Sequence, residues 1–239
     1  MRRPSNESPI EPLHRRIAAH GVTPLAVAGP YRSGTSLVAA VCHALGADVG
    51  ALANRATPRN PIGSFEAPLL AERCRQMYTE PWLVESVNRT QRVTSLAAWL
   101  SMAMTAAGGA QIIGGKHPIL CLLSDELLEA WGERTKFLFV RRPVDEAIAS
   151  LRKTNWLPWR ANPGSHEQAI ERLAAARDRA IERLGARSLV IDYHEMLRRP
   201  ESAVDRIARF LGTGSPAGVA QAIALIQPAL YRTKIERTR

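Results

Sequence analysis

Residues 26–37 read Ala-Val-Ala-Gly-Pro-Tyr-Arg-Ser-Gly-Thr-Ser-Leu, an apolar run that enters a glycine-bounded turn and continues into a helical pattern. A strand, such a turn and a helix in this order are typical of phosphate-binding loops. Backbone N–H groups at the helix N-terminus face the anion, and the helix dipole favours its charge. The stretch therefore predicts an α/β protein with a site for a phosphorylated ligand.

The cation of this loop is unusual in its position. Nucleoside triphosphatase loops read G-x-x-x-x-G-K-[ST], where the Lys binds the β- and γ-phosphates and the hydroxyl binds magnesium. Here Gly29 and Gly34 keep the glycine spacing, but Thr35 stands in place of that Lys, and the loop carries Arg32 instead. The loop thus favours a phosphorylated ligand other than ATP with magnesium, and the sequence contains no convincing cluster of metal ligands.

Composition and charge narrow the class of partner. The chain has 239 residues, 46% of them hydrophobic, and a formal net charge of +10. This excess of basic residues predicts an anionic partner, such as a nucleotide, a nucleic acid or a membrane surface, although an Arg-rich composition explains much of it equally well.

Neither a secretory signal nor an apolar run long enough to span a membrane is apparent in the sequence. The three cysteines, an odd number without C-x-x-C spacing, suit reduced and buried thiols. We therefore expect a soluble, cytoplasmic protein.

Strand and helix patterns alternate along the chain. We expect strands over 25–28, 111–114, 136–140 and 188–191, and helices over 36–45, 67–78, 91–107, 120–130, 145–151, 166–184, 200–211 and 217–226. This alternation predicts a three-layer α/β architecture, a parallel sheet flanked by helices. We expect a flexible N-terminal segment over 1–20, a single domain over 21–230 and a basic tail over 231–239.

Three polar stretches follow predicted strands. They are the Gly29–Ser36 loop, Lys116-His117 and Arg141-Arg142. Because the carboxyl ends of parallel strands meet at one edge of a sheet, we expect the three to lie together there.

Four segments, in the order in which they occur along the chain, resemble sequence motifs of the sulfotransferase family. Gly29–Ser36 resembles the family's 5′-phosphosulfate-binding loop, and residues 137–145, Phe-Leu-Phe-Val-Arg-Arg-Pro-Val-Asp, resemble the strand that ends in Arg-x-Pro and holds the 3′-phosphate. The other two are similar to patterns of bacterial members: residues 60–66, and residues 192–197 with Pro200 and Phe210-Leu211-Gly212. The resemblance covers about residues 23 to 213 and implies the P-loop-like sulfotransferase fold.

The resemblance implies transfer of a sulfuryl group from 3′-phosphoadenosine-5′-phosphosulfate, a co-substrate, to a hydroxyl or amine, without a metal. It assigns the 5′-phosphosulfate to a run of five loop residues: Arg32, Ser33, Gly34, Thr35 and Ser36. It assigns the 3′-phosphate to Arg141 and Ser150, with Arg232 as a late clamp.

Three positions depart from the family pattern. Tyr31 stands where a second Pro or a small residue is usual, and Arg32 stands where cytosolic members usually carry Lys. Ser150 lies nine residues after Arg141, where the family has eight. Arg142 has the eight-residue spacing to Ser150, but it directly precedes Pro143.

The acceptor needs a base within hydrogen-bond reach. Two residues are candidates: Glu66, in the acidic loop motif, and His117, which follows Lys116 in a segment similar to the family's Lys-x-His. We favour Glu66 slightly over His117 as the catalytic base, with Arg32 as the catalytic cation. The partners are thus an anionic nucleotide donor and an unidentified hydroxyl-bearing acceptor, while the oligomeric state stays open.

Two other functions compete. Ser188–Asp192 resembles a Walker B strand and suggests a P-loop kinase or nucleotide-binding ATPase, but the missing Lys after Gly34 opposes it. A non-catalytic nucleic-acid-binding protein is suggested by charge alone. Aromatic residues make up only 5% of the chain and no nucleic-acid-binding motif is present, so we expect no nucleic acid as a partner.

Overall fold

The computed structural model describes residues 10–50, 62–154, 161–162 and 164–227. Its main sheet contains four parallel strands, β1 (Thr23–Ala28), β4 (Ile112–Lys116), β5 (Lys136–Arg141) and β6 (Ser188–Asp192), in the order β4-β1-β5-β6. A two-stranded antiparallel ribbon pairs β2 (Tyr78–Thr79) with β3 (Val84–Glu85). The predicted α/β fold class is confirmed.

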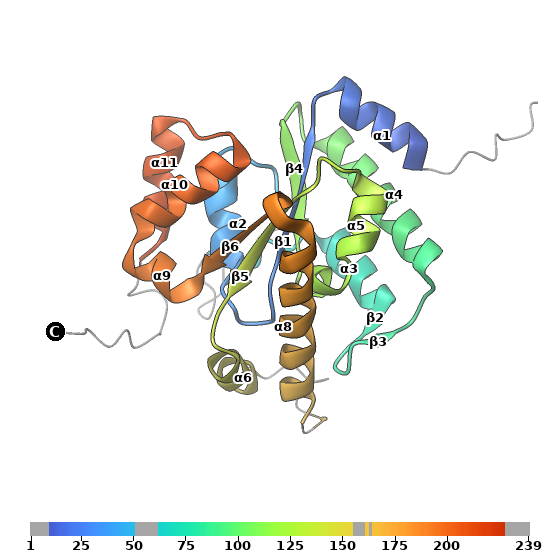
Figure 1. Ribbon diagram of the computed structural model, residues 1–239, viewed down its shortest axis with the longest axis vertical. Coiled ribbons are helices and arrows are strands. Elements are labelled where there is room, and N and C mark those ends of the chain that lie inside the picture. Colours follow the sequence, from blue (N-terminus) through green and yellow to red (C-terminus); the bar gives the residue numbers. More distant parts are fainter. Residues whose placement is uncertain (1–9, 51–61, 155–160, 163, 228–239) are drawn as a thin grey trace, which may run out of the picture.

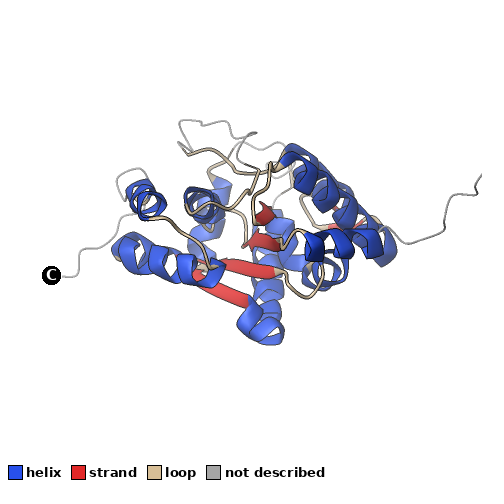
Figure 2. Ribbon diagram, turned by 90° about the horizontal axis from the view of Figure 1, so that it is seen from above, coloured by secondary structure: helices blue, strands red, loops and turns tan. Residues whose placement is uncertain are grey.

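Helices cover both faces of the main sheet. One face carries α1 (Ile10–Ala19), α3 (Pro68–Met77), α4 (Arg89–Ala106), α5 (Ser124–Trp131), α6 (Val144–Arg152) and α8 (Ser165–Leu184). The other carries α2 (Thr35–Ala44), α9 (Tyr193–Arg198), α10 (Pro200–Leu211) and α11 (Pro216–Leu225). Figure 1 shows α2, α9, α10 and α11 to the left of the sheet and α1, α3, α4 and α5 to its right. Figure 2 shows the strands enclosed between the helices, which gives the three predicted layers.

The strands separate two apolar clusters. Along β1, Ala26 and Ala28 pack into the cluster beneath α4, whereas Leu25 and Val27 pack into the cluster beneath α2. Successive side chains of a strand point to opposite faces, so a strand buried on both faces must be apolar almost throughout. This explains why the near-continuous apolar run of β1 predicted a central strand.

The strand order contains a switch point. The chain passes from β1 to β4 on one side and then to β5 on the other side of β1. In open parallel sheets of this kind, ligands bind beside the carboxyl ends of the two strands at which the order reverses. The loops that follow β1 and β5 therefore flank the expected binding edge.

Several segments differ from the sequence-based expectation. Helix α1 occupies residues 10–19, where the polar composition indicated a flexible segment, because two of its apolar side chains, Leu13 and Ile17, share one face and are buried. The single helix expected over 120–130 is instead a 3-10 helix, η2 (Pro118–Leu122), followed by α5. A second 3-10 helix, η3, spans Gly185–Arg187.

Helix α9 was not expected at all. It follows β6 directly, and the carboxylate of Asp192 accepts a hydrogen bond from the backbone N–H of Glu195 at 2.8 Å. This is an N-cap in the ordinary sense, which satisfies one of the unpaired N–H groups at the start of a helix. The cap places Tyr193 and His194 at the carboxyl edge of the sheet.

Candidate active site

The loop over residues 29–34 joins β1 to α2. Gly34 precedes the helix with a φ of 98°, in the left-handed region, and no side chain caps α2 among the described residues. Arg32 has a φ of 64°, which is uncommon for a residue with a side chain. The uncapped N-terminus of α2 therefore faces the binding edge of the sheet with its backbone N–H groups.

The hydroxyl groups of the loop have different environments. Ser36 Oγ donates to the carbonyl of Ser64 at 3.1 Å, which ties the start of α2 to the 62–66 segment. Thr35 is buried. Ser33 is fully buried, and its Oγ has no hydrogen-bond partner among the described residues. A buried hydroxyl normally has a partner, so the loop retains an unused donor that an anion bound there would satisfy.

Arg32 lies between two parts of the chain that follow β5. Its Nε donates to Ser150 Oγ of α6 at 3.2 Å, and its backbone carbonyl accepts from Arg142 Nη1 at 2.9 Å. The structure therefore brings Ser150 to the loop despite its displaced position in the sequence. It also adds a second cation, Arg142, beside the first.

Arg141 faces away from the residues that Arg142 contacts. Its Nη2 lies 3.3 Å from Asp178 Oδ1 of α8, and its side chain is half exposed. Burial alone would raise the pKa of Asp178, but its hydrogen bonds and charge contacts with Arg177, and then with Arg141, outweigh burial and hold that pKa below its ordinary value. Arg141 is thus held by a carboxylate that stays ionised.

Glu66 forms an ion pair at the end of β4. Lys116 Nζ lies 2.6 Å from Glu66 Oε1; the lysine side chain is 4% exposed and that of the glutamate is 28% exposed. Burial alone would raise the pKa of Glu66, but the charge and the hydrogen bond of Lys116, together with smaller contributions from neighbouring basic side chains, outweigh burial and lower that pKa from its ordinary value. Lys116 is paired in register with Val27 of β1, two residues before the loop begins at Gly29. Glu66 is therefore an ionised carboxylate close to the phosphate-binding loop.

His117 is buried behind this pair. Its Nδ1 accepts a hydrogen bond from the backbone N–H of Ile119 at 3.2 Å, which caps η2. Burial lowers the pKa of His117 to about 4, and the charge of Lys116 contributes to that lowering. A neutral imidazole whose Nδ1 accepts carries its proton on Nε2, so neither ring nitrogen is available to take a proton from an acceptor.

Tyr31, the residue that departs from the family pattern, anchors the loop on its other side. Its buried hydroxyl donates a short hydrogen bond to Glu80, which lies between β2 and β3. Burial raises the pKa of Tyr31, and the charges of Glu80 and Glu66 raise it further. A small residue at this position would leave that contact unmade.

The structure thus brings together Arg32 and Ser150 at one end of the site, and Glu66 and His117 on either side of Lys116 at the other. Arg141 instead pairs with Asp178 of α8, and Arg232 lies outside the described residues. Sequence reasoning assigned no role to Arg142, although its spacing to Ser150 was a usable signal. It had no signal for Glu80.

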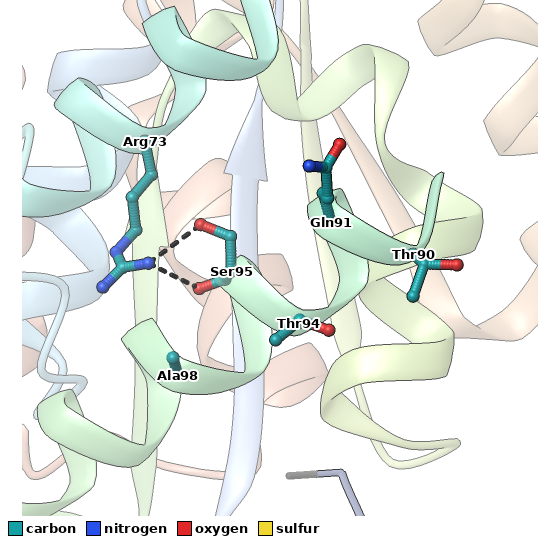
Figure 3. A pocket seen from close by; sticks show the side chains of 6 residues that line it. All are labelled: Arg73, Thr90, Gln91, Thr94, Ser95 and Ala98. Carbon is teal, nitrogen blue, oxygen red and sulfur yellow. Dashed lines mark hydrogen bonds between the residues drawn. The ribbon is translucent and has the colours of Figure 1, made fainter. Parts of the chain in front are cut away.

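Two surface cavities lie elsewhere. One of about 340 Å³ lies between α3 and α4, where Arg73 Nη1 donates to the Oγ and the carbonyl of Ser95 (Figure 3). The other, of about 260 Å³, is lined by His43 and Phe65 together with residues of α2 and α11. Neither cavity is lined by the loop over residues 29–34. The argument that this loop binds a ligand therefore rests on the cations and hydrogen-bonding groups of the loop.

A search of the described residues for groups of three or more His, Cys, Asp or Glu side chains placed like metal ligands finds none. In the same part of the chain, no helix combines the length and the apolar character that crossing a membrane requires.

Comparison with protein families gives one match. The profile described as "Sulfotransferase family" matches residues 24–216, from β1 to the start of α11. No curated protein matches the chain.

Solved structures share the fold at low sequence identity. A sulfotransferase from Mycobacterium avium aligns with a TM-score of 0.52 and 15% identity, over 92% of this chain and 73% of its own. The sulfotransferase domain of an olefin synthase from Synechococcus PCC 7002 aligns with a TM-score of 0.50 and 17% identity, over 83% of this chain and 76% of its own.

Proposed function

The chain belongs to the sulfotransferase family, and from that premise we propose which of its residues bind the donor and which residue activates the acceptor. The protein is an enzyme that transfers a sulfuryl group from 3′-phosphoadenosine-5′-phosphosulfate. The donor, when bound, supplies the sulfuryl group and leaves as adenosine 3′,5′-bisphosphate. The acceptor is a hydroxyl-bearing or amine-bearing molecule.

The 5′-phosphosulfate is bound by the loop over residues 29–34 and the N-terminus of α2. The observation that carries this assignment is the position of Arg32, whose guanidinium lies at the loop against Ser150, while Arg142 holds its carbonyl. A guanidinium stays charged throughout, so Arg32 stabilises the charge that develops on the leaving oxygen without donating a proton. The hydroxyl of Ser33, which has no partner in the described part of the chain, adds a hydrogen-bond donor. The groups of Gly34, Thr35 and Ser36 add others.

The 3′-phosphate is assigned to the residues that follow β5. Arg141, half exposed at the end of the strand, and Ser150 on α6 are the ligands in this proposal, as the family resemblance implies. Arg141 would exchange its contact with Asp178 for the phosphate, which offers a bidentate partner of higher charge. Arg232 is included as a further ligand of the 3′-phosphate because the family resemblance implies it.

Glu66 is the base in this proposal. Its carboxylate accepts the proton of the acceptor hydroxyl as that oxygen bonds to sulfur and the bond from sulfur to the leaving oxygen breaks. Lys116 keeps the carboxylate ionised and fixes its direction. His117 is disfavoured because its Nδ1 already accepts a hydrogen bond from the backbone.

Donor binding is tested by calorimetry with adenosine 3′,5′-bisphosphate and no metal. We expect Arg32→Ala to bind about 10- to 100-fold more weakly than the wild type, because a hydrogen-bonded charge contact is lost. Arg209→Ala, which removes an exposed arginine of α10, is the matched control and should bind like the wild type. Equal affinities of Arg32→Ala and the wild type would overturn the donor site.

The base is tested by turnover at saturating donor, with p-cresol, a phenol that stays protonated at neutral pH, as the probe acceptor and release of adenosine 3′,5′-bisphosphate as the readout. Loss of a general base lowers kcat by about 10²- to 10⁴-fold, and we expect this of Glu66→Gln. We expect His117→Ala to retain most of the turnover once its folding is verified. Wild-type turnover by Glu66→Gln would exclude Glu66 as the base.

A further inference from the structure

Arg142 is held from three directions by residues of three different segments. Its Nη1 donates to the carbonyl of Arg32 in the loop, at 2.9 Å, and its Nε donates to Glu146 Oε2 in the first turn of α6, at 3.0 Å. Its guanidinium also stacks over the ring of Tyr193, at the start of α9, with Cζ 4.9 Å from the ring centroid. The side chain is only 14% exposed.

A second layer supports these contacts. His194 Nε2 lies 2.9 Å from Glu146 Oε1 and 3.0 Å from Oε2, the oxygen that also accepts from Arg142 Nε, so the imidazole and the guanidinium hold the carboxylate together. The ring of Tyr193 also packs against the end of the loop, since a Cβ added to Gly34 would lie 2.3 Å from Tyr193 Cδ2. The segment after β6 belongs to a pattern to which the family resemblance gave no role. It thus contacts both the loop and the Arg142–Glu146 pair.

We propose that Glu146 is a positioning residue for the donor site: with His194 and Tyr193 behind it, Glu146 holds Arg142 on the carbonyl of Arg32 and so fixes the loop in its binding conformation. This inference rests on the proposed function, because it takes the loop to be the donor site. None of the three residues needs to touch the donor.

The backbone of Arg32 gives the physical reason. A left-handed conformation at a residue with a side chain persists only where the surrounding structure enforces it. Arg142 donates a hydrogen bond to the carbonyl of Arg32. Its planar guanidinium keeps that carbonyl in place only if the guanidinium is itself held in a fixed orientation. Glu146 fixes it, and its negative charge offsets the repulsion between two neighbouring arginines.

A simpler role for Glu146 is favourable charge at the N-terminus of α6, where it lies in the first turn. That role stabilises the helix without affecting the affinity for the donor. The two roles are therefore distinguished by ligand affinity measured separately from the melting temperature.

The experiment is a double-mutant cycle in the full chain, with the Kd of adenosine 3′,5′-bisphosphate as the readout. We expect Glu146→Ala and Arg142→Ala each to raise the Kd about tenfold, and the double variant to bind no more weakly than Arg142→Ala alone. Glu146→Gln, which keeps an acceptor for Arg142 Nε but loses the charge, should fall between the wild type and Glu146→Ala. Glu201→Ala removes an exposed acid from the first turn of α10 and should leave the Kd unchanged.

An unchanged Kd in Glu146→Ala, or additive effects in the double variant, would overturn the proposal. Should Glu146→Ala fail to fold, His194→Ala serves in its place, with a twofold to fivefold rise in Kd that disappears in the Arg142→Ala background. The proposed function fails separately: an Arg32→Ala variant that binds like the wild type overturns the donor site, whereas weak binding by Arg32→Ala with wild-type binding by Glu146→Ala overturns the positioning role alone.

Discussion

The ionisation of Glu66 depends mainly on one neighbour. Burial works against the charged carboxylate, and the charge of Lys116, itself almost fully buried, is the largest contribution that opposes burial. The pair therefore keeps Glu66 able to accept a proton at pH values where an isolated buried carboxyl group would already be protonated.

Replacement of Lys116 with Met should raise the pKa of Glu66, because burial then acts without the opposing charge. The acid limb of the pH profile of kcat/KM should move to higher pH, since the base loses its function once it is protonated. The measurement is turnover of the p-cresol probe as a function of pH, with Lys153→Met as the control for loss of an exposed lysine. An acid limb at the same pH in Lys116→Met and wild type would show that another group limits the reaction.

His117 predicts a pH dependence of stability. In the folded chain its pKa is lowered to about 4, whereas in the unfolded chain it returns to about 6.5. The unfolded state therefore binds more protons between these values, and the free energy of unfolding falls as the pH drops through that window and is fully present above it.

The variant His117→Asn keeps a side chain that can cap η2 but does not titrate. Between pH 7 and pH 4.5 we expect the wild type to lose about 2 to 3 kcal/mol more stability than His117→Asn. Urea unfolding at the two pH values measures this difference. Equal losses in the two proteins would show that His117 is protonated in the folded state.

The sequence was informative about residues whose role follows from local spacing. The glycines of the loop and the position of Arg32 within it could be interpreted without a structure. Which of Arg141 and Arg142 faces the loop could not be decided without a structure, because consecutive residues at the end of a strand point to opposite faces. Arg141 meets Asp178 of α8, on one face, and Arg142 meets Tyr193, on the other, and only the packing of those helices decides which faces the loop.

Among the elements, α1 shows how composition alone misleads. Its charged residues gave a polar average, yet Leu13 and Ile17 lie one turn apart and both are buried in the core cluster. The periodicity carries the information that the mean value hides.

Truncation of Leu13 to Ala should therefore destabilise the protein by about 2 to 5 kcal/mol, the usual cost of a large-to-small change in a core. Arg15→Ala, on the exposed face of the same helix, should change stability by less than about 0.5 kcal/mol. Urea unfolding of both variants is the measurement. A Leu13→Ala variant as stable as the wild type would support the earlier interpretation that this segment is flexible.

Other elements were missed for lack of local signal. The ribbon of β2 and β3 has two residues in each strand, too few to show an alternating pattern. Helix α9 has six residues, and its cap at Asp192 closely follows a strand. The longer elements, such as β5 and α8, lie within one residue of their predicted bounds at each end.

At the level of the whole molecule, strand order creates the site. Arg32 contacts Arg142 and Ser150 across sequence separations of 110 and 118 residues, because β5 lies beside β1 rather than at the end of a sequential array. The sequence predicted that the loops meet at one edge of the sheet, and this is confirmed. It did not predict which strands are neighbours, since that depends on the packing of helices on both faces.

The shared sheet also predicts that the chain unfolds as one unit, and this prediction tests the single domain that the sequence indicated over residues 21–230. The same strands contribute to both apolar clusters, so loss of one cluster removes the sheet against which the other packs. We expect guanidinium-induced unfolding to show one transition, with α4 and α10 losing protection from hydrogen exchange together. Leu96→Ala in one cluster and Ile207→Ala in the other should each lower the stability of both helices by about 2 to 5 kcal/mol. Loss of protection in α10 at a denaturant concentration that leaves α4 protected would show two separately folding parts. The proposed donor site at the edge of the shared sheet would then depend on their association.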